Sequence, residues 1–158
     1  MDIHSLGLLC EASYCPDFIS TDEAQALFDE LASSYDLSNK TIQMADGSQY
    51  EAENRLYLFA DEHLTSYDKL TQVWGRRSVW PDSLRNVRDK IASIYGVCFP
   101  VARSVFYQDG FESMGFHSDP PAYGATDAIA SLSLGAERDF ILRPIAKKDE
   151  NTVVRLAS

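Results

Sequence analysis

The sequence contains few cysteines and no long apolar run. Its three cysteines are an odd number at wide spacing, which excludes a disulfide framework and a paired CxxC zinc site. We interpret Cys10, Cys15 and Cys98 as small core residues of a protein in a reducing compartment. No apolar run approaches the ~20 residues of a membrane-spanning helix, and the N-terminus lacks the basic start of a secretory signal. We therefore expect a soluble, cytoplasmic protein without membrane contact.

Positive charge is also scarce. Fourteen Lys and Arg residues stand against twenty-four Asp and Glu residues, a net charge of -10 that argues against a strongly electrostatic, non-specific nucleic-acid binder. Residues 1–70 carry three basic and fourteen acidic side chains, whereas residues 71–158 carry eleven and ten, so a polyanion would approach the second half. The second half contains a local basic run, for which a solvated helix face is the alternative interpretation: Arg76, Arg77, Arg85, Arg88 and Lys90.

Motifs of nucleotide binding and of serine hydrolases are absent. The sequence has no GxGxxG turn, no Walker loop and no GxSxG nucleophile elbow. It also has no internal repeat and no Gly/Ser-rich linker, so we expect residues 1–158 to form a single domain.

Two helices are predicted in the first 96 residues. The first begins at a capping box of Ser20 and Glu23 and continues with apolar residues at helical spacing: Ala24, Leu27, Phe28 and Leu31. The second follows Trp80-Pro81 and ends at Gly96. Its apolar stripe consists of Leu84, Val87, Ile91 and Ile94.

After Gly96 the apolar residues alternate, as in β-strands. The predicted strands are Val97–Tyr107, Ala128–Leu134, Asp139–Arg143 and Thr152–Leu156. Two helices followed by a run of strands indicate an α+β fold with an antiparallel β core.

The chemistry of a metal site is suggested by His117 and Asp119. They stand two residues apart, on or just after a predicted strand, where residues i and i+2 point to the same side. One imidazole and one carboxylate are two of the three ligands in the 2-His-1-carboxylate triad of non-haem Fe(II) oxygenases. The alternative is a His–Asp hydrogen bond at a strand end.

The surroundings of this pair form a longer pattern. A Y-x-D-G turn at residues 107–110 precedes it, and residues 131–143 follow it with the pattern SLSxGAxRxFxxR. This ordered set resembles the core of the AlkB family of Fe(II)- and 2-oxoglutarate-dependent dioxygenases. The segments Pro16-Asp17-Phe18-Ile19 and Trp80-Pro81 resemble earlier family motifs. The resemblance implies a double-stranded β-helix, or jelly-roll, with N-terminal helices and a substrate lid in 1–96 and a partial jelly-roll in 97–158.

The resemblance also implies roles for individual residues. His117 and Asp119 would bind Fe(II), and Tyr107 would hydrogen-bond the cosubstrate 2-oxoglutarate. Substrate-binding candidates are Arg55, Phe59, Tyr67 and Arg143. For Phe59 a place in the core, and for Arg143 an ion pair with Asp139 or another carboxylate, are the alternatives. The implied activity is oxidative demethylation of N-alkylated nucleic-acid bases by a monomer, with DNA favoured over RNA.

The sequence departs from the family pattern in two places. Val105, which cannot donate a hydrogen bond, replaces an asparagine that binds the cosubstrate. The last strands of the jelly-roll, with a distal histidine and arginines, would follow Ser158, so we expect weak Fe(II) binding and no succinate formation by residues 1–158 alone. The alternatives to a nucleic-acid demethylase are a 2-oxoglutarate oxygenase with a protein or small-molecule substrate, and a truncated, catalytically inactive binding module.

Overall fold

The computed structural model describes residues 2–8, 10–43, 47–66, 76–119 and 126–157. The chain divides into two compact units, one made of residues 31–129 and the other of residues 1–30 and 130–158. The boundary at residue 30 falls inside helix α1, Thr21–Ser34.

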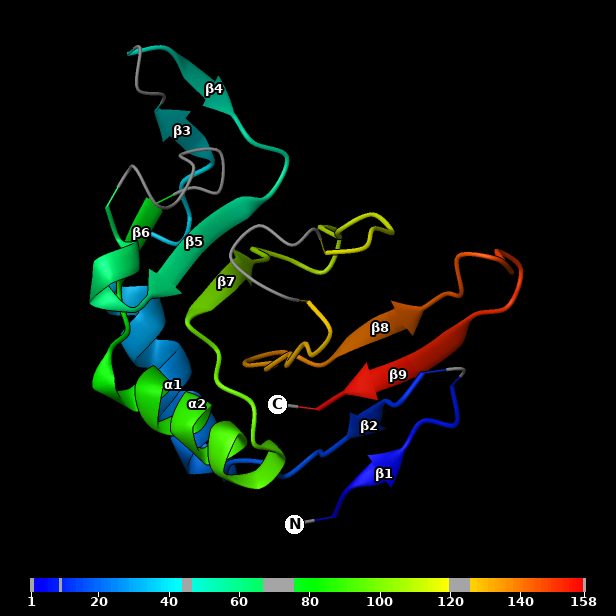
Figure 1. Cartoon of the computed structure of the whole chain (residues 1–158). Helices are drawn as coiled ribbons and strands as arrows, with labels where there is room; N and C mark the ends of the chain where they lie inside the picture. Colours follow the sequence, from blue (N-terminus) through cyan, green and yellow to red (C-terminus); the bar gives the residue numbers. More distant parts are fainter. Residues whose placement is uncertain (1, 9, 44–46, 67–75, 120–125, 158) are drawn as a thin grey trace. The chain divides into compact units, whose positions relative to one another are not determined.

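A three-stranded sheet forms the centre of the unit 31–129 (Figure 1). Its middle strand β5, Arg55–Ala60, pairs antiparallel with β7, Val101–Phe106, and parallel with β6, Arg76–Val79. A separate antiparallel pair, β3 (Thr41–Gln43) and β4 (Gln49–Glu51), precedes β5. The predicted strand Val97–Tyr107 contains β7, but the parallel pairing of β5 with β6 corrects the expectation of a purely antiparallel core.

Strand β5 carries the core of this unit. Leu58, Phe59 and Ala60 are completely buried, and their side chains alternate between the two faces of the sheet. The ring of Phe59 makes an edge-to-face contact with Tyr35, with ring centroids 4.9 Å apart, and lies 5.1 Å from the ring of Tyr57. A buried ring offers no face to a nucleobase, so the core position is correct for Phe59 and the base-stacking role is not.

Helix α2, Asp82–Tyr95, agrees with the predicted second helix. Pro81, with φ -65°, stands immediately before its first residue, and Gly96 ends it in the left-handed region at φ 68°. Val87 is buried as the apolar stripe requires, whereas Ile94 near the C-terminal end is exposed. The pattern therefore predicted both ends of α2, whereas the predicted apolar stripe is fully buried only at Val87.

The second unit contains the N-terminal part of α1 and two antiparallel strand pairs. Strands β1 (His4–Ser5) and β2 (Ser13–Tyr14) form one pair, and β8 (Arg138–Leu142) and β9 (Thr152–Leu156) form the other. The predicted strands Asp139–Arg143 and Thr152–Leu156 correspond to β8, displaced by one residue, and to β9. The mixture of helices and mainly antiparallel sheets confirms the predicted α+β class. The described residues form four separate sheets and no closed barrel.

The start of α1 has the predicted capping box. The Ser20 backbone N–H donates to the Glu23 carboxylate at 2.9 Å, and the Glu23 N–H donates to the Ser20 hydroxyl at 3.2 Å. Ala24, Leu27 and Leu31 are buried. The apolar residues predicted from their helical spacing are therefore the ones that form the buried face of α1.

Two sequence predictions are wrong. Residues 126–137 form no strand, because strand-forming side chains give a ladder only where a second strand pairs with them, and none pairs with this stretch among the described residues. The cysteines are not core residues, since Cys10 and Cys98 are exposed and Cys15 is half-buried. Across the described ranges, no helix has the length and apolar character required to span a membrane.

Candidate metal centre

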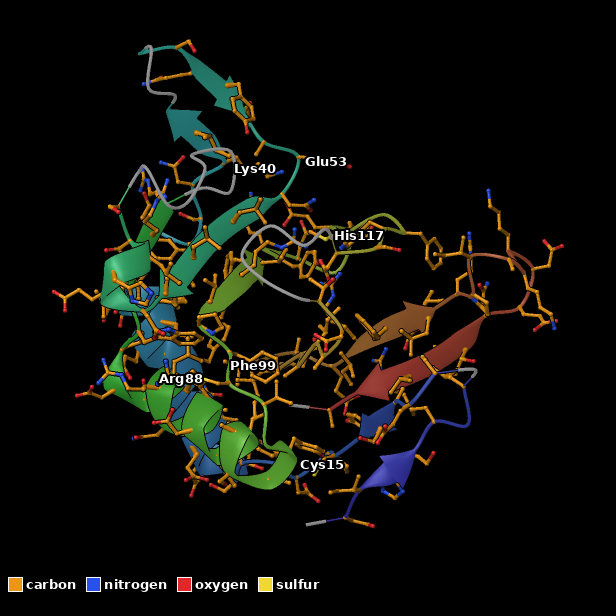
Figure 2. The ribbon with its side chains drawn as sticks, in the orientation of Figure 1. Cys15, Lys40, Glu53, Arg88, Phe99 and His117 are labelled. Carbon is orange, nitrogen blue, oxygen red and sulfur yellow. The ribbon has the colours of Figure 1, made fainter. Side chains whose placement is uncertain are left out.

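His117 and Asp119 lie on the loop that follows β7, where Figure 2 shows His117. The imidazole Nε2 of His117 and the carboxylate Oδ1 of Asp119 are 3.5 Å apart, and the two side chains are 42% and 38% exposed. The expected closeness of the two side chains is confirmed. The backbone at residues 117–119 is irregular and forms no strand. The two side chains are therefore brought together by the conformation of the loop, and not by the i, i+2 spacing of a strand.

A backbone carbonyl orients the imidazole of His117. The ring Nδ1 is 2.8 Å from the carbonyl oxygen of Gly115, which can only accept a hydrogen bond. In the neutral ring the proton therefore resides on Nδ1, and Nε2 keeps its lone pair on the side of Asp119. Metal-binding histidines are commonly held in this way.

A third side chain, that of Arg103 on β7, contacts both His117 and Asp119. Its Nη2 is 3.3 Å from His117 Nε2, 3.4 Å from Asp119 Oδ1 and 3.7 Å from the sulfur of Met114. A cationic group is thus in contact with both donor atoms that a metal would use. No sequence motif points to Arg103, although it is the one charged residue in the strand Val101–Phe106.

The donor set fits Fe(II) in part. One imidazole nitrogen and one carboxylate oxygen are ligands of the kind that non-haem Fe(II) takes. Among the described residues, no group of three His, Cys, Asp or Glu side chains gathers at one point. His63 lies on a short 3-10 turn, Glu62–Leu64. The described residues therefore supply two candidate ligands, His117 and Asp119.

A pocket of about 360 Å³ opens beside these ligands in the same unit. Its wall is formed by Glu53, Asn54, Leu56, Arg103 and residues 114–117. Glu53 and Asn54 precede β5, Leu56 belongs to it, and Figure 2 shows the positions of Glu53 and His117. A small molecule in this pocket would contact both Arg103 and His117.

A network around Glu112 anchors the loop that carries His117. The guanidinium of Arg55 donates to the Glu112 carboxylate, to Gln108 Oε1 at 2.7 Å and to the backbone carbonyl of Ser38 at 2.8 Å. Glu112 also accepts the Gln108 backbone N–H at 2.7 Å and lies 3.5 Å from Lys40 Nζ. The Gln108 N–H, followed by the Arg55 guanidinium, lowers the pKa of Glu112 from 4.5 to about 2. The loop is therefore tied by charge to β5 and to the segment before β3.

The structure does not bring the predicted substrate-binding residues together at one site. Arg55 is only 12% exposed and is bound within the Glu112 network, so it positions the loop and is not placed to hold a base. Tyr107 follows β7 directly, and Tyr67 lies outside the described residues. Arg143 belongs to the other unit, where its Nε donates to Asn151 Oδ1 at 3.0 Å. Asp139, the suggested partner of Arg143, pairs with Arg155 at 3.0 Å.

Most of the predicted basic run has carboxylate partners. Arg76 pairs with Asp36, Arg85 pairs with Asp82 at 2.8 Å, and Arg88 pairs with Asp61 at 2.8 Å. Arg88 also lies over the ring of Trp80, 5.1 Å from its centroid. These three cations are locally compensated, which reduces the positive charge that the run offers to a polyanion.

Comparison with known proteins agrees with the site chemistry. Residues 11–158 match the model of the 2OG-Fe(II) oxygenase superfamily. Alpha-ketoglutarate-dependent dioxygenase alkB homolog 3 from Bos taurus is 28% identical over 138 residues, covering 87% of this chain and 47% of that protein. The Homo sapiens protein of the same name is 27% identical over 137 residues, with coverages of 86% and 46%.

A second kind of relative carries a more specific name. DNA oxidative demethylase ALKBH2 from Mus musculus is 28% identical over 141 residues, covering 87% of this chain and 56% of that protein. The chain spans about half the length of these curated relatives. Because the superfamily match includes nearly every residue, the chain belongs to the 2OG-Fe(II) oxygenases, which use Fe(II) and 2-oxoglutarate. Within this superfamily it is similar to the alkB homologs named above.

Proposed function

We propose that the chain carries the iron-binding region of an AlkB-type dioxygenase that oxidatively demethylates N-alkylated bases, with DNA favoured over RNA. The observation that carries this proposal is the pair of donor atoms, His117 Nε2 and Asp119 Oδ1, 3.5 Å apart beside a pocket. The substrate class is suggested by the relatives, which are two dioxygenases and one DNA oxidative demethylase.

The roles of the chain's own residues follow from their contacts. His117 and Asp119 would hold Fe(II), and the bound metal would supply the redox chemistry with 2-oxoglutarate and dioxygen. The Gly115 carbonyl keeps the proton on Nδ1, so that Nε2 remains a donor for the metal. The Arg55–Glu112 network holds the loop in place. Tyr107, directly after β7, would donate a hydrogen bond from its hydroxyl group to the cosubstrate.

A protein or small-molecule substrate is the second candidate. It is favoured by the pairing of Arg76, Arg85 and Arg88 with carboxylates, which leaves less positive charge for phosphate groups. Under this alternative the metal ligands keep their roles and only the substrate changes.

The two candidates are separated by competition for the Mn²⁺-loaded protein. A fluorescent single-stranded oligonucleotide with one N-methylated base should bind more tightly than its unmethylated copy, and unlabelled methylated oligonucleotide should displace it. A methylated peptide should not displace it. Displacement by the peptide, together with equal affinity for the two oligonucleotides, would contradict the nucleic-acid proposal and favour the alternative.

A further inference from the structure

The pocket beside His117 is lined by two segments that lie beyond the end of a strand pairing. The β5 side consists of Glu53 and Asn54, directly before β5, and the loop side consists of residues 114–117, on the loop after β7. The ladder between β5 and β7 ends at the pair of Arg55 and Phe106. The ladder therefore does not fix the distance between the β5 side and the loop side.

The side chain of Arg55 joins the start of β5 to the loop. Its Nη1 donates to the carboxylate of Glu112, and its Nη2 donates to Gln108 Oε1 at 2.7 Å. Its Nε donates to the backbone carbonyl of Ser38, before β3, at 2.8 Å. A guanidinium carries its N–H donors in fixed directions in one plane. One side chain therefore holds two other segments at a set position relative to β5.

A local turn transmits this position to the loop side of the pocket. Asp109 Oδ1 accepts the backbone N–H groups of Phe111 at 2.8 Å and of Glu112 at 3.1 Å. The side chains of Arg55 and Glu112 are 12% and 24% exposed, and charge-assisted hydrogen bonds between such sheltered groups are strong. The loop side begins at Met114, two residues after Glu112. A displacement of Glu112 would therefore move the loop side relative to the β5 side.

We propose that Arg55 is a positioning residue that sets the spacing of the two sides of the pocket and thereby the affinity for substrate, an inference that rests on the function proposed above. Arg55 does not line the pocket itself. It acts through Asn54, which it follows directly, and through Glu112. A pocket whose sides are already held in place binds its ligand without first ordering them, which raises the affinity. A lysine has a single nitrogen and cannot replace the three donors of Arg55.

The spacing can be measured by NMR with Mn²⁺ as the probe. Mn²⁺ bound at the proposed metal site is paramagnetic and broadens the signals of nearby amide groups, more strongly at shorter distances. In the unaltered chain the backbone amide signals of Asn54 and Phe116 should both broaden. In Arg55→Lys the broadening of Asn54 should fall severalfold relative to that of Phe116, because the β5 side is no longer held against the loop side.

The effect on substrate is measured with the Mn²⁺-loaded protein and a single-stranded oligonucleotide that carries one N-methylated base. Arg55→Lys should bind this oligonucleotide roughly tenfold more weakly, since the sides of the pocket must then be ordered on binding. The unmethylated copy should bind the variant and the unaltered chain equally. The variant therefore loses preference for the methylated base and keeps its affinity for the backbone.

Arg88→Lys is the matched control for a general loss of stability. Arg88 belongs to the same unit, is 16% exposed and pairs with Asp61 and Asp89, and it does not line the pocket. This variant should keep the Asn54 broadening and both affinities of the unaltered chain.

The outcomes separate the inference from the function on which it rests. Asn54 broadening in Arg55→Lys equal to that of the unaltered chain, or an unchanged preference for the methylated oligonucleotide, would overturn the role of Arg55 alone. An unaltered chain in which the Phe116 amide stays sharp at saturating Mn²⁺, or which binds the two oligonucleotides equally, would instead overturn the proposed function.

Discussion

At the scale of single residues, Glu112 has the clearest electrostatic signature of the site region. It accepts hydrogen bonds from the Gln108 backbone and from Arg55, and it lies near Lys40. These groups lower its pKa to about 2, so the folded protein favours the charged carboxylate. This network could not be predicted from the sequence, because Arg55 and Glu112 are 57 positions apart.

The substitution Glu112→Gln should make thermal stability less dependent on pH. A lowered pKa stabilises the fold fully above the ordinary value of 4.5, and this contribution is lost as the pH falls from 4.5 towards about 2. The unaltered chain should therefore have a higher Tm than the variant at pH 6, and the difference should narrow between pH 4.5 and 3. Circular dichroism melts at several pH values measure this. A Tm difference that stays constant over the range would contradict the assignment, and Glu150→Gln, at the exposed Lys147–Glu150 pair, is the control.

At the scale of elements, local sequence patterns predicted the helices and strands whose formation depends on residues close to one another in the chain. The capping box and the Pro81 and Gly96 signals located both helices, and Thr152–Leu156 was predicted residue by residue. Strand β5 was missed, because Arg55–Ala60 packs on both faces and shows no clear alternation. Residues 128–134 were predicted as a strand from the alternation of their apolar side chains. Strand formation also requires a pairing partner, which is a non-local property, and no described strand pairs with this segment.

Helix α1 offers a direct check of the local signals. Ser20→Ala removes the hydroxyl that accepts the Glu23 N–H, and it should lower the free energy of unfolding by about 0.5–2 kcal/mol. Ser20→Thr retains a capping hydroxyl and should recover most of the loss. Urea denaturation followed by circular dichroism gives both values. Equal stability of the alanine variant and the unaltered chain would show that the box contributes nothing to the fold.

At the scale of the whole molecule, the candidate site lies within one of the two units. His117, Asp119, Arg103 and the pocket wall all belong to residues 31–129. The HxD spacing predicted that His117 and Asp119 lie close together, and the family resemblance predicted the oxygenase superfamily, both from contiguous motifs. Arg103 escaped prediction because a single charged residue in a strand becomes informative only when the loop that folds back onto it is known.

The central claim is that His117 and Asp119 bind the metal. The chain has three histidines, His4, His63 and His117, so Mn²⁺-induced broadening of their imidazole proton signals in an NMR titration tests this claim directly. At substoichiometric Mn²⁺ the His117 signals should broaden first, and Asp119→Ala should shift this effect to roughly tenfold or higher Mn²⁺ concentrations. Broadening of His63 or His4 while the His117 signals remain sharp would contradict the account.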